Sequence, residues 1–208
     1  MHISDGVLPT SVAIGGFAAS VAVIAWSARR TKAEDFPKIA VMTSAFFVAS
    51  LIHVPIGPTS VHLLIPGLVG ILLGNSAFIS IALGLLLQSI LFQFGGITAL
   101  GANSLMMGIP ALVAGWIFRS WGRGSLTRYV LCGALAGGVG VFLAVLFLAA
   151  LLLTGGEDFW GVAKIAMYAH LPVILIETCV SGFAVSFLYK VKPELLGSVS
   201  PSCSMEQS

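Results

Sequence analysis

The chain has 208 residues, of which 58% are hydrophobic and only 9% charged, and its mean hydropathy is +1.05. Soluble domains carry roughly a quarter of their residues as charges, so this composition excludes a soluble domain and predicts several membrane-spanning segments. The net charge of +2 comes from scattered Lys and Arg, which argues against nucleic acid as a partner.

Seven apolar stretches follow one another along the chain, and each approaches the ~20 residues that a helix needs to cross a bilayer. They lie at residues 9–28, 37–54, 61–74, 77–94, 103–121, 129–153 and 161–189. We predict an all-α, polytopic membrane bundle of about seven transmembrane helices, which forms one domain over residues 1–196. Residues 197–208 are polar and rich in Ser, which predicts a disordered cytoplasmic tail.

Positive charges predict the orientation of this bundle in a prokaryotic cell membrane. If there are seven spans, only Lys164 lies on one side, and the other nine basic residues share the opposite side: Arg29, Arg30, Lys32, Lys38, Arg119, Arg123, Arg128, Lys190 and Lys192. The positive-inside rule then places the amino terminus outside and the carboxyl terminus in the cytoplasm. No basic region precedes the first span and Arg29-Arg30 follow it, so we expect it to remain uncleaved. We expect Met1 to be retained because a bulky second residue such as His2 normally blocks its removal.

The first two residues, Met1 and His2, have the pattern of a metal chelate. The terminal amine, the amide nitrogen of residue 2 and the imidazole of His2 can reach one ion through a five-membered and a six-membered ring. One more imidazole would complete a planar set of four nitrogens, which suits Ni(II) or Cu(II) better than tetrahedral Zn(II) or octahedral Mg(II). The alternative is that His2 is an ordinary terminal residue.

Three other histidines are candidates for the fourth nitrogen. In the predicted topology His53 and His62 share the outer side with His2, whereas His170 lies nearly half-way along the seventh span. Residues 55–62 are rich in Gly and Pro, which suits a backbone folded back to line a polar cavity, with His62 at the start of a helix. Each histidine has the alternative role of a hydrogen-bonded residue between helices.

A second outer loop, residues 95–103, contains three glycines and is accompanied by Gln93, Thr98 and Asn103. These polar residues are candidates to orient His2 or His62 by hydrogen bonds, although a close-packed helix connector is an equal alternative. Ser60, two residues before His62, and Asp5 are further candidates. For Asp5 we favour a structural role, in which its carboxylate caps the first helix.

His170 and Glu177 are seven residues apart and therefore lie on one face of the seventh helix. Ionisable groups inside a membrane are functional candidates, so this pair supports an alternative function as a stand-alone cation channel or secondary carrier. A satisfied polar contact between helices is the interpretation we favour. A purely structural membrane subunit is a third hypothesis.

The sequence contains no enzyme motif of the HExxH, GxSxG or P-loop type, so we predict neither an enzyme nor an organic cofactor. An ATP-driven process would need another subunit. Small residues recur at four-residue spacing in the first span (15/19 and 18/22) and in the sixth (133/137). This spacing allows close helix packing, either within the bundle or against a partner membrane subunit.

Four segments of the sequence resemble the CbiM/NikM family, which comprises the substrate-binding S components of energy-coupling factor transporters for cobalt and nickel. They are MHISDGVL at the start, GPTSVHLL from Gly57, QFGGITALGAN from Gln93 and LYKVKPELL from Leu188. Family members often have Gly where Val61 stands and Asn where His53 stands. His53 is therefore either a weak entry ligand or a space-filling residue.

The resemblance implies that Met1, His2 and His62 hold the transported ion, Ni(II) or alternatively Co(II). It also implies partners that the chain itself does not reveal: a second membrane scaffold (the T component), cytoplasmic ATPase subunits and a small accessory membrane protein.

Overall fold

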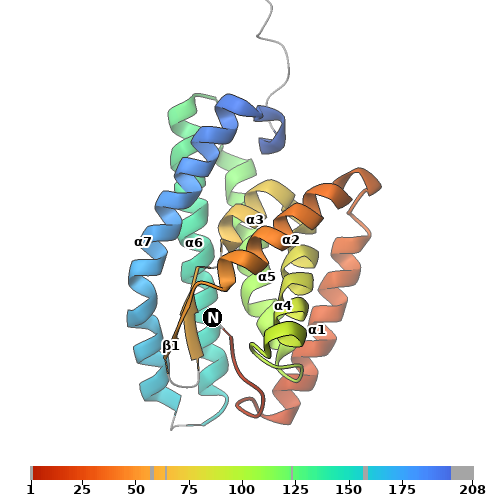
Figure 1. Ribbon diagram of the computed structural model, residues 1–208, viewed down its shortest axis with the longest axis vertical. Helices are drawn as coiled ribbons and strands as arrows, with labels where there is room; N and C mark the ends of the chain where they lie inside the picture. Colours follow the sequence, from red (N-terminus) through yellow and green to blue (C-terminus); the bar gives the residue numbers. More distant parts are fainter. Residues whose placement is uncertain (1, 57–58, 64, 123, 157–158, 198–208) are drawn as a thin grey trace, which may run out of the picture.

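The computed structural model describes residues 2–56, 59–63, 65–122, 124–156 and 159–197, and for residues 53–56 and 59–62 it describes the backbone. The predicted tail therefore lies outside the described residues, apart from Gly197. Seven helices run along a single bundle (Figure 1). They are α1 (Thr10–Ala28), α2 (Phe36–Ser50), α3 (Pro66–Leu73), α4 (Ala77–Phe92), α5 (Leu100–Trp121), α6 (Leu126–Leu153) and α7 (Trp160–Val191).

The predicted membrane bundle is confirmed, but the count of seven membrane-spanning helices is not. Within the described residues, five stretches are long and apolar enough to cross a membrane as helices: α1, α5, α6, α7 and the combined stretch Pro66–Phe92. The helix α2 has 15 residues and α3 has 8, so each is too short to cross alone. The second and third predicted spans are instead part helix and part strand.

The second and third stretches meet in a short antiparallel ribbon, which the all-α prediction did not include. Strand β1 (His53–Ile56) pairs with β2 (Thr59–His62), and His53 is directly opposite His62 in the register. Proline lacks the N–H that a helix interior needs, and β-branched residues favour extended backbone, so this Pro-, Val- and Ile-containing segment does not continue the helix.

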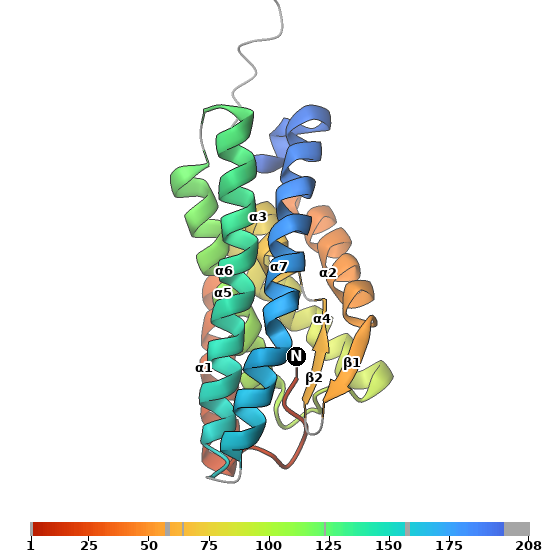
Figure 2. The same cartoon turned by 90° about the vertical axis from the view of Figure 1, so that its left-hand side faces the viewer.

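This ribbon corrects the predicted position of His62. The residue ends strand β2, and the next helix begins only at Pro66, four residues later. His62 is thus not at a helix start. The ribbon lies beside α7 (Figure 2), where β2 is the strand nearer to that helix.

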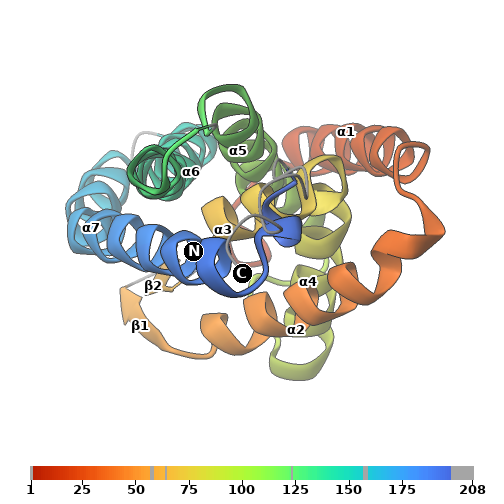
Figure 3. The same ribbon diagram turned by 90° about the horizontal axis from the view of Figure 1, so that it is seen from above.

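The short helix α3 lies in the middle of the bundle, surrounded by the longer helices when viewed from above (Figure 3). Opposite charges flank its two ends. Before its first turn, the Glu177 carboxylate accepts a hydrogen bond of 2.6 Å from the N–H of Ile65, and in its last turn the Arg119 guanidinium donates to the carbonyl of Gly70 at 3.2 Å. An anion at the start and a cation near the end both complement the helix dipole.

Helices α6 and α7 pack closely because α6 presents small residues to α7. A Cβ added at Gly133 would lie 2.6 Å from Val185, and one added at Gly137 would lie 2.4 Å from the Ser181 hydroxyl. The small-residue spacing in the sixth span therefore serves packing within the bundle.

Helix α1 lies at the edge of the bundle and packs mainly on α5. Gly16 contacts Ala102, where an added Cβ would come within 3.0 Å of the Ala102 nitrogen. The residues of the predicted motif in this helix lie on its uncovered side, and they are Gly15, Ala18, Ala19 and Ala22. Two of the three predicted small-residue pairs thus have no packing role inside this protein.

We predict that Gly70→Ala destabilises the bundle whereas Gly15→Ala does not. A Cβ at Gly70 would lie 1.9 Å from the Ala111 carbonyl oxygen, and one at Gly15 would meet nothing within 4 Å. Overpacking a well-packed core costs about 1–3 kcal/mol, while alanine gains up to ~1 kcal/mol over glycine in an open helical position. Thermal unfolding in detergent tests this pair, and an equal melting temperature for both variants would contradict the packing described here.

Candidate metal centre

The segment before α1 turns back into the bundle. It rises from the start of α1 and, in Figure 2, lies beside β2 and α7 (dark red in Figures 1 and 2). Ile3 is completely buried and belongs to the main hydrophobic core, and His2 is only 5% exposed. Full burial of an isoleucine side chain contributes roughly 1.5–3 kcal/mol, which helps to hold the segment inside.

Asn103 binds the backbone of Ile3 from both sides. The Ile3 N–H donates to Oδ1 of Asn103 at 3.0 Å, and Nδ2 of Asn103 donates to the Ile3 carbonyl at 3.0 Å. Asn103 lies in the first turn of α5 and is 2% exposed, so both bonds are shielded from water. Because a buried peptide group without partners costs about 1–3 kcal/mol, this reciprocal pair makes burial of the residue after His2 possible.

Phe94 and Gly95 shape the space around His2. The Phe94 ring is stacked on the imidazole with centroids 6.4 Å apart and an interplanar angle of 23°. Gly95 has φ +79°, and a Cβ there would lie 3.2 Å from Cβ of His2 and 2.9 Å from Nδ2 of Asn103. Glycine at position 95 therefore allows the loop to close over both residues.

Asp5 does not cap the first helix, so that prediction is wrong. Helix α1 begins at Thr10 after Pro9, with no side-chain cap. The Asp5 carboxylate instead accepts hydrogen bonds from the Thr98 hydroxyl and, at 2.9 Å, from the Thr98 N–H. Gly96 leaves room for this contact, since an added Cβ would lie 2.1 Å from the Asp5 carboxyl carbon. Thr98 and Asp5 thus join the loop to the amino-terminal segment.

The Thr98 hydroxyl, which donates to the carboxylate, lowers the pKa of Asp5 below its ordinary value, and the neighbouring backbone N–H groups add to this effect. Ionisation of the Asp5 carboxylate therefore stabilises its contact with Thr98, which joins the loop to the amino-terminal segment. Asp5 itself remains exposed, so its charge is screened by solvent.

Four of the predicted residues fall where side chains are not described. Met1 lies outside the described residues, and His53, Ser60 and His62 are described by their backbone alone. The backbone of His62 belongs to strand β2, which lies beside both α7 and the amino-terminal segment (Figure 2). Among the side chains that the structure describes, no three of His, Cys, Asp and Glu gather as a metal site.

Two other predicted residues, Gln93 and Glu177, have structural roles. Gln93 is exposed, and its left-handed backbone (φ +56°) ends helix α4. Glu177 is fully buried and binds the N–H of Ile65, which agrees with the satisfied contact between elements that the sequence favoured. This contact gives Glu177 a structural partner and offers no support for a proton or cation relay.

Two further residues, Phe94 and Gln88, were not among the predicted site residues. Phe94 was treated only as the end of a span, although it stacks on His2. Gln88 is fully buried in α4, one turn before the loop, and its backbone carbonyl accepts the Phe94 N–H at 3.3 Å. The hint in the sequence was an amide side chain in the interior of the apolar stretch 77–94, a position where polar groups are functional candidates.

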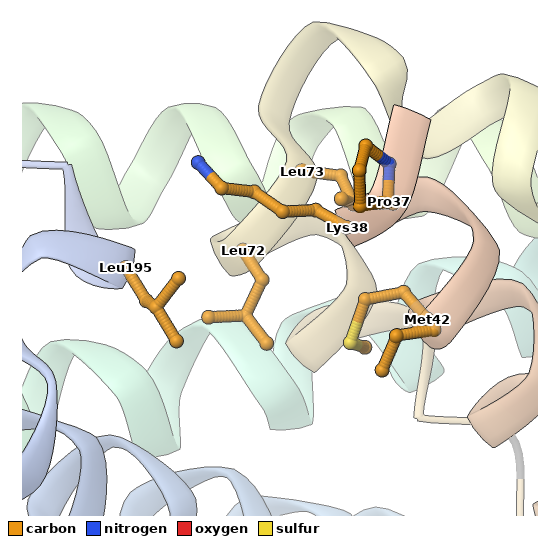
Figure 4. Close-up of a pocket in the computed structure, with 7 residues that line it drawn as sticks. Pro37, Lys38, Met42, Leu72, Leu73 and Leu195 are labelled. Carbon is orange, nitrogen blue, oxygen red and sulfur yellow. The ribbon is translucent and has the colours of Figure 1, made fainter. Parts of the chain in front are cut away.

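An apolar cavity lies away from these residues. It has a volume of about 280 Å3 and lies between α2, α3 and the short turn Pro193–Leu196. Its lining consists of hydrocarbon, apart from the Lys38 ammonium and the Met42 thioether (Figure 4). Such a lining offers little to a hard or borderline metal ion.

The family model described as the cobalt uptake substrate-specific transmembrane region, CbiM, matches residues 2–195 of this chain. A Haemophilus influenzae protein, named provisionally as a metal transport protein, is 38% identical over 199 residues, covering 94% of this chain and 97% of that protein. The cobalt transport protein CbiM of Sorangium cellulosum is 29% identical over 94% of each chain. The fused nickel transport protein NikMN of Rhodobacter capsulatus is 31% identical over 94% of this chain, which spans 64% of its length.

Solved structures agree with these matches. A crystal structure described as a transition metal transporter superposes with a TM-score of 0.79 at 31% identity, covering 92% of this chain and 93% of that one. A second, described as a truncated transition metal transporter, gives a TM-score of 0.77 at 30% identity, covering 92% of this chain and 99% of that one. The resemblance found in the sequence is thereby confirmed at the level of family and fold.

We predict that Asn103→Leu releases the amino-terminal segment. The substitution keeps a similar volume but leaves the Ile3 N–H and carbonyl without partners, so the buried state loses about 1–3 kcal/mol for each group. Hydrogen exchange at the Ile3 amide should become at least tenfold faster than in the wild type. Asn75→Ala, in the exposed turn after α3, is the control and should leave this rate unchanged. Equal protection in the wild type and Asn103→Leu would contradict the role given to Asn103.

We also predict that Thr98→Val raises the pKa of Asp5 toward its ordinary value of about 3.9, because the strongest donor to the carboxylate is lost. In the wild type the contact is fully present above that value and disappears as the pH falls through the lowered pKa. NMR titration of the Asp5 carboxyl carbon measures both values, with Thr31→Val at the far end of α1 as the control. Identical titration curves in the wild type and Thr98→Val would show that the hydroxyl has no such effect.

Proposed function

The chain belongs to the CbiM family, and on this basis we propose that it is the membrane subunit that captures Ni(II), or alternatively Co(II), for uptake into the cell. Members of the family carry names for cobalt or nickel transport, and this chain is a multi-pass membrane protein of that family. The family description is that of a transmembrane transport region rather than an enzyme.

The proposed ligands are the amine of Met1, the amide nitrogen and imidazole of His2, and the imidazole of His62. The first three form two fused chelate rings, and the last closes a planar set of four nitrogens. A planar nitrogen set favours a d8 ion, so we expect Ni(II) to be preferred over Co(II). Cu(II) binds such sites strongly by the Irving–Williams order, so its exclusion depends on its availability in the cell.

The single observation that supports this site best is the burial of His2. A histidine next to a chain terminus would normally be solvated, yet His2 is 5% exposed, it is stacked on Phe94, and the following residue is bound by Asn103. These contacts hold the terminal segment inside the bundle, where it lies beside strand β2 in Figure 2. Preorganisation of this kind reduces the entropy lost when a chelate forms.

The transport process that we propose includes partners. Energy for uptake would come from cytoplasmic ATPase subunits, through a second membrane scaffold and with a small accessory membrane protein. The uncovered face of α1, with Gly15, Ala18, Ala19 and Ala22, supports a helix of the scaffold as its neighbour, because small residues allow close approach in a membrane. In the orientation predicted by charge, the metal site opens toward the outer side.

Binding should be sensitive to pH because the ligands must lose protons. The terminal amine and the imidazoles have ordinary pKa values near 7.7–8.0 and ~6.5, so acid competes with the metal. Affinity is therefore expected to fall steadily as the pH is lowered from 7.5 to 5.5.

Isothermal titration with Ni(II) tests the proposed site in protein purified with an unmodified amino terminus. We expect one ion per chain in the wild type and loss of at least a hundredfold in affinity when three Gly residues are added before Met1, because the terminal amine is then too far along the chain to form a chelate ring with the amide of His2. The control is three Gly residues inserted after Gly6, in an exposed turn with φ +82°, which leaves the first two residues unchanged.

His62→Ala should likewise remove the yellow absorption band of planar Ni(II). Unchanged nickel affinity after the extension before Met1 would refute the terminal chelate. An undiminished band in His62→Ala would exclude His62 as a ligand.

A further inference from the structure

His170 is a completely buried histidine whose tautomer is fixed by its surroundings. It lies in α7, and its Nδ1 is 2.7 Å from the carbonyl oxygen of Ala166. A carbonyl oxygen only accepts hydrogen bonds, so Nδ1 must be the nitrogen that bears the proton. Nε2 of the neutral ring then has a lone pair and acts as an acceptor.

This acceptor has no partner in the part of the chain that the structure describes. Leaving a buried polar atom unsatisfied costs about 1–3 kcal/mol, so such atoms in native proteins call for an explanation. The face of α7 around His170 gives none, because the neighbouring buried residues one and two turns earlier are Ala166 and Ala163. A donor from another element is the simplest way to satisfy Nε2.

The depth of His170 in the bundle can be compared with that of His62 through a shared reference point. The Glu177 carboxylate binds the N–H of Ile65, so these two residues lie at one level. His170 precedes Glu177 by seven helical residues, or about 10.5 Å at 1.5 Å per residue. His62 precedes Ile65 by three residues, or at most about 10 Å of extended chain. The chain between His62 and Ile65 is therefore long enough for His62 to lie at the depth of His170.

The two elements also lie side by side. Strand β2 contacts α7, and both views in Figures 1 and 2 place them next to the amino-terminal segment. Ile3 and Ala166, one turn before His170, belong to the same hydrophobic core. His170, with its unpartnered nitrogen, thus lies on the helix that packs against strand β2.

A metal-bound imidazole uses one nitrogen for the ion and keeps an N–H on the other. Histidine ligands almost always donate this N–H to a nearby acceptor, which fixes the tautomer and the orientation of the ring. We propose that Nε2 of His170 is this acceptor for metal-bound His62. The inference rests on the proposed function, and it makes His170 a positioning residue that has no contact with the metal.

The consequence is a chain of contacts from backbone to metal. The Ala166 carbonyl fixes the His170 tautomer, His170 fixes the ring of His62, and His62 then presents its other nitrogen to the ion. Second-shell partners of this type typically contribute 10–100-fold in metal affinity. Ionisation of His170 is not required at any step.

Nickel titration and absorption spectroscopy of position-170 variants test the proposal. We expect His170→Leu to weaken Ni(II) binding 10–100-fold while the planar absorption band keeps its position, because the four ligands remain. His170→Gln should stay within about threefold of the wild type, since its amide oxygen also accepts a hydrogen bond. Ser181→Ala is the matched control, because Ser181 is equally buried on the same face of α7, and it should bind as the wild type does.

Several outcomes would overturn this inference alone. Unchanged affinity in His170→Leu would show that Nε2 is not used, and equal weakening in His170→Gln would indicate packing instead of hydrogen bonding. A shifted or lost band in His170→Leu would make His170 a ligand. If the wild type binds no Ni(II), or if His62→Ala binds as well as the wild type, the proposed function itself fails and the inference falls with it.

A second measurement needs no variant and remains available if His170→Leu does not fold. In wild-type protein with 15N-labelled histidine, Nε2 of His170 should resonate as an unprotonated nitrogen. Addition of Ni(II) should shift this resonance in the direction of a hydrogen-bonded acceptor. A resonance that is unaffected by stoichiometric Ni(II) would contradict the proposal.

Discussion

The reciprocal pair of hydrogen bonds between Asn103 and the backbone of Ile3 is the constraint on which the rest of the site depends. A chain terminus in an apolar bundle would leave its peptide groups without water, so it stays inside only if another residue replaces the lost hydrogen bonds. Asn103 supplies both partners, with two bonds of 3.0 Å. Phe94 and Gly95 then close over His2, and Thr98 holds the exposed side of the segment through Asp5. The loop that precedes α5 therefore supplies several of the contacts that hold the segment carrying the proposed ligand His2.

The bundle has room for this terminal segment because its second and third passes are not full helices. The paired strands β1 and β2 replace helix in the half of the bundle where the amino terminus enters, and α3 fills the other half. A half-helix inside a bundle exposes its terminal N–H and carbonyl groups, which need partners. Glu177 and Arg119 provide them. Two ionisable residues within the apolar region are thus explained by the architecture. The buried Nε2 of His170 has no hydrogen-bond partner among the described residues.

Much of this arrangement could be predicted from the sequence. Hydropathy placed six of the seven helices to within a few residues at most boundaries, and terminal Met-His together with a later histidine indicated the kind of site. The β-ribbon was not predicted, because a short apolar stretch interrupted by Pro and Gly is compatible with helix ends and with strands alike. The helix-cap prediction for Asp5 failed since a cap and a long-range contact use the same carboxylate chemistry, and only tertiary structure brings Thr98 within reach. Gln88 and Phe94 were missed because nothing in a single apolar span marks the side that faces a distant terminus.

The central claim is that the chain's own beginning, turned inward and held by Asn103, binds the transported ion. Crystallographic anomalous scattering at the nickel absorption edge, from protein with an unmodified amino terminus soaked in Ni(II), tests it most directly. The account predicts one strong peak within bonding distance of the Met1 amine, the His2 amide and imidazole nitrogens and the His62 ring, with Asn103 still bound to Ile3. A peak located elsewhere, with residues 1 and 2 extended into solvent, would contradict it.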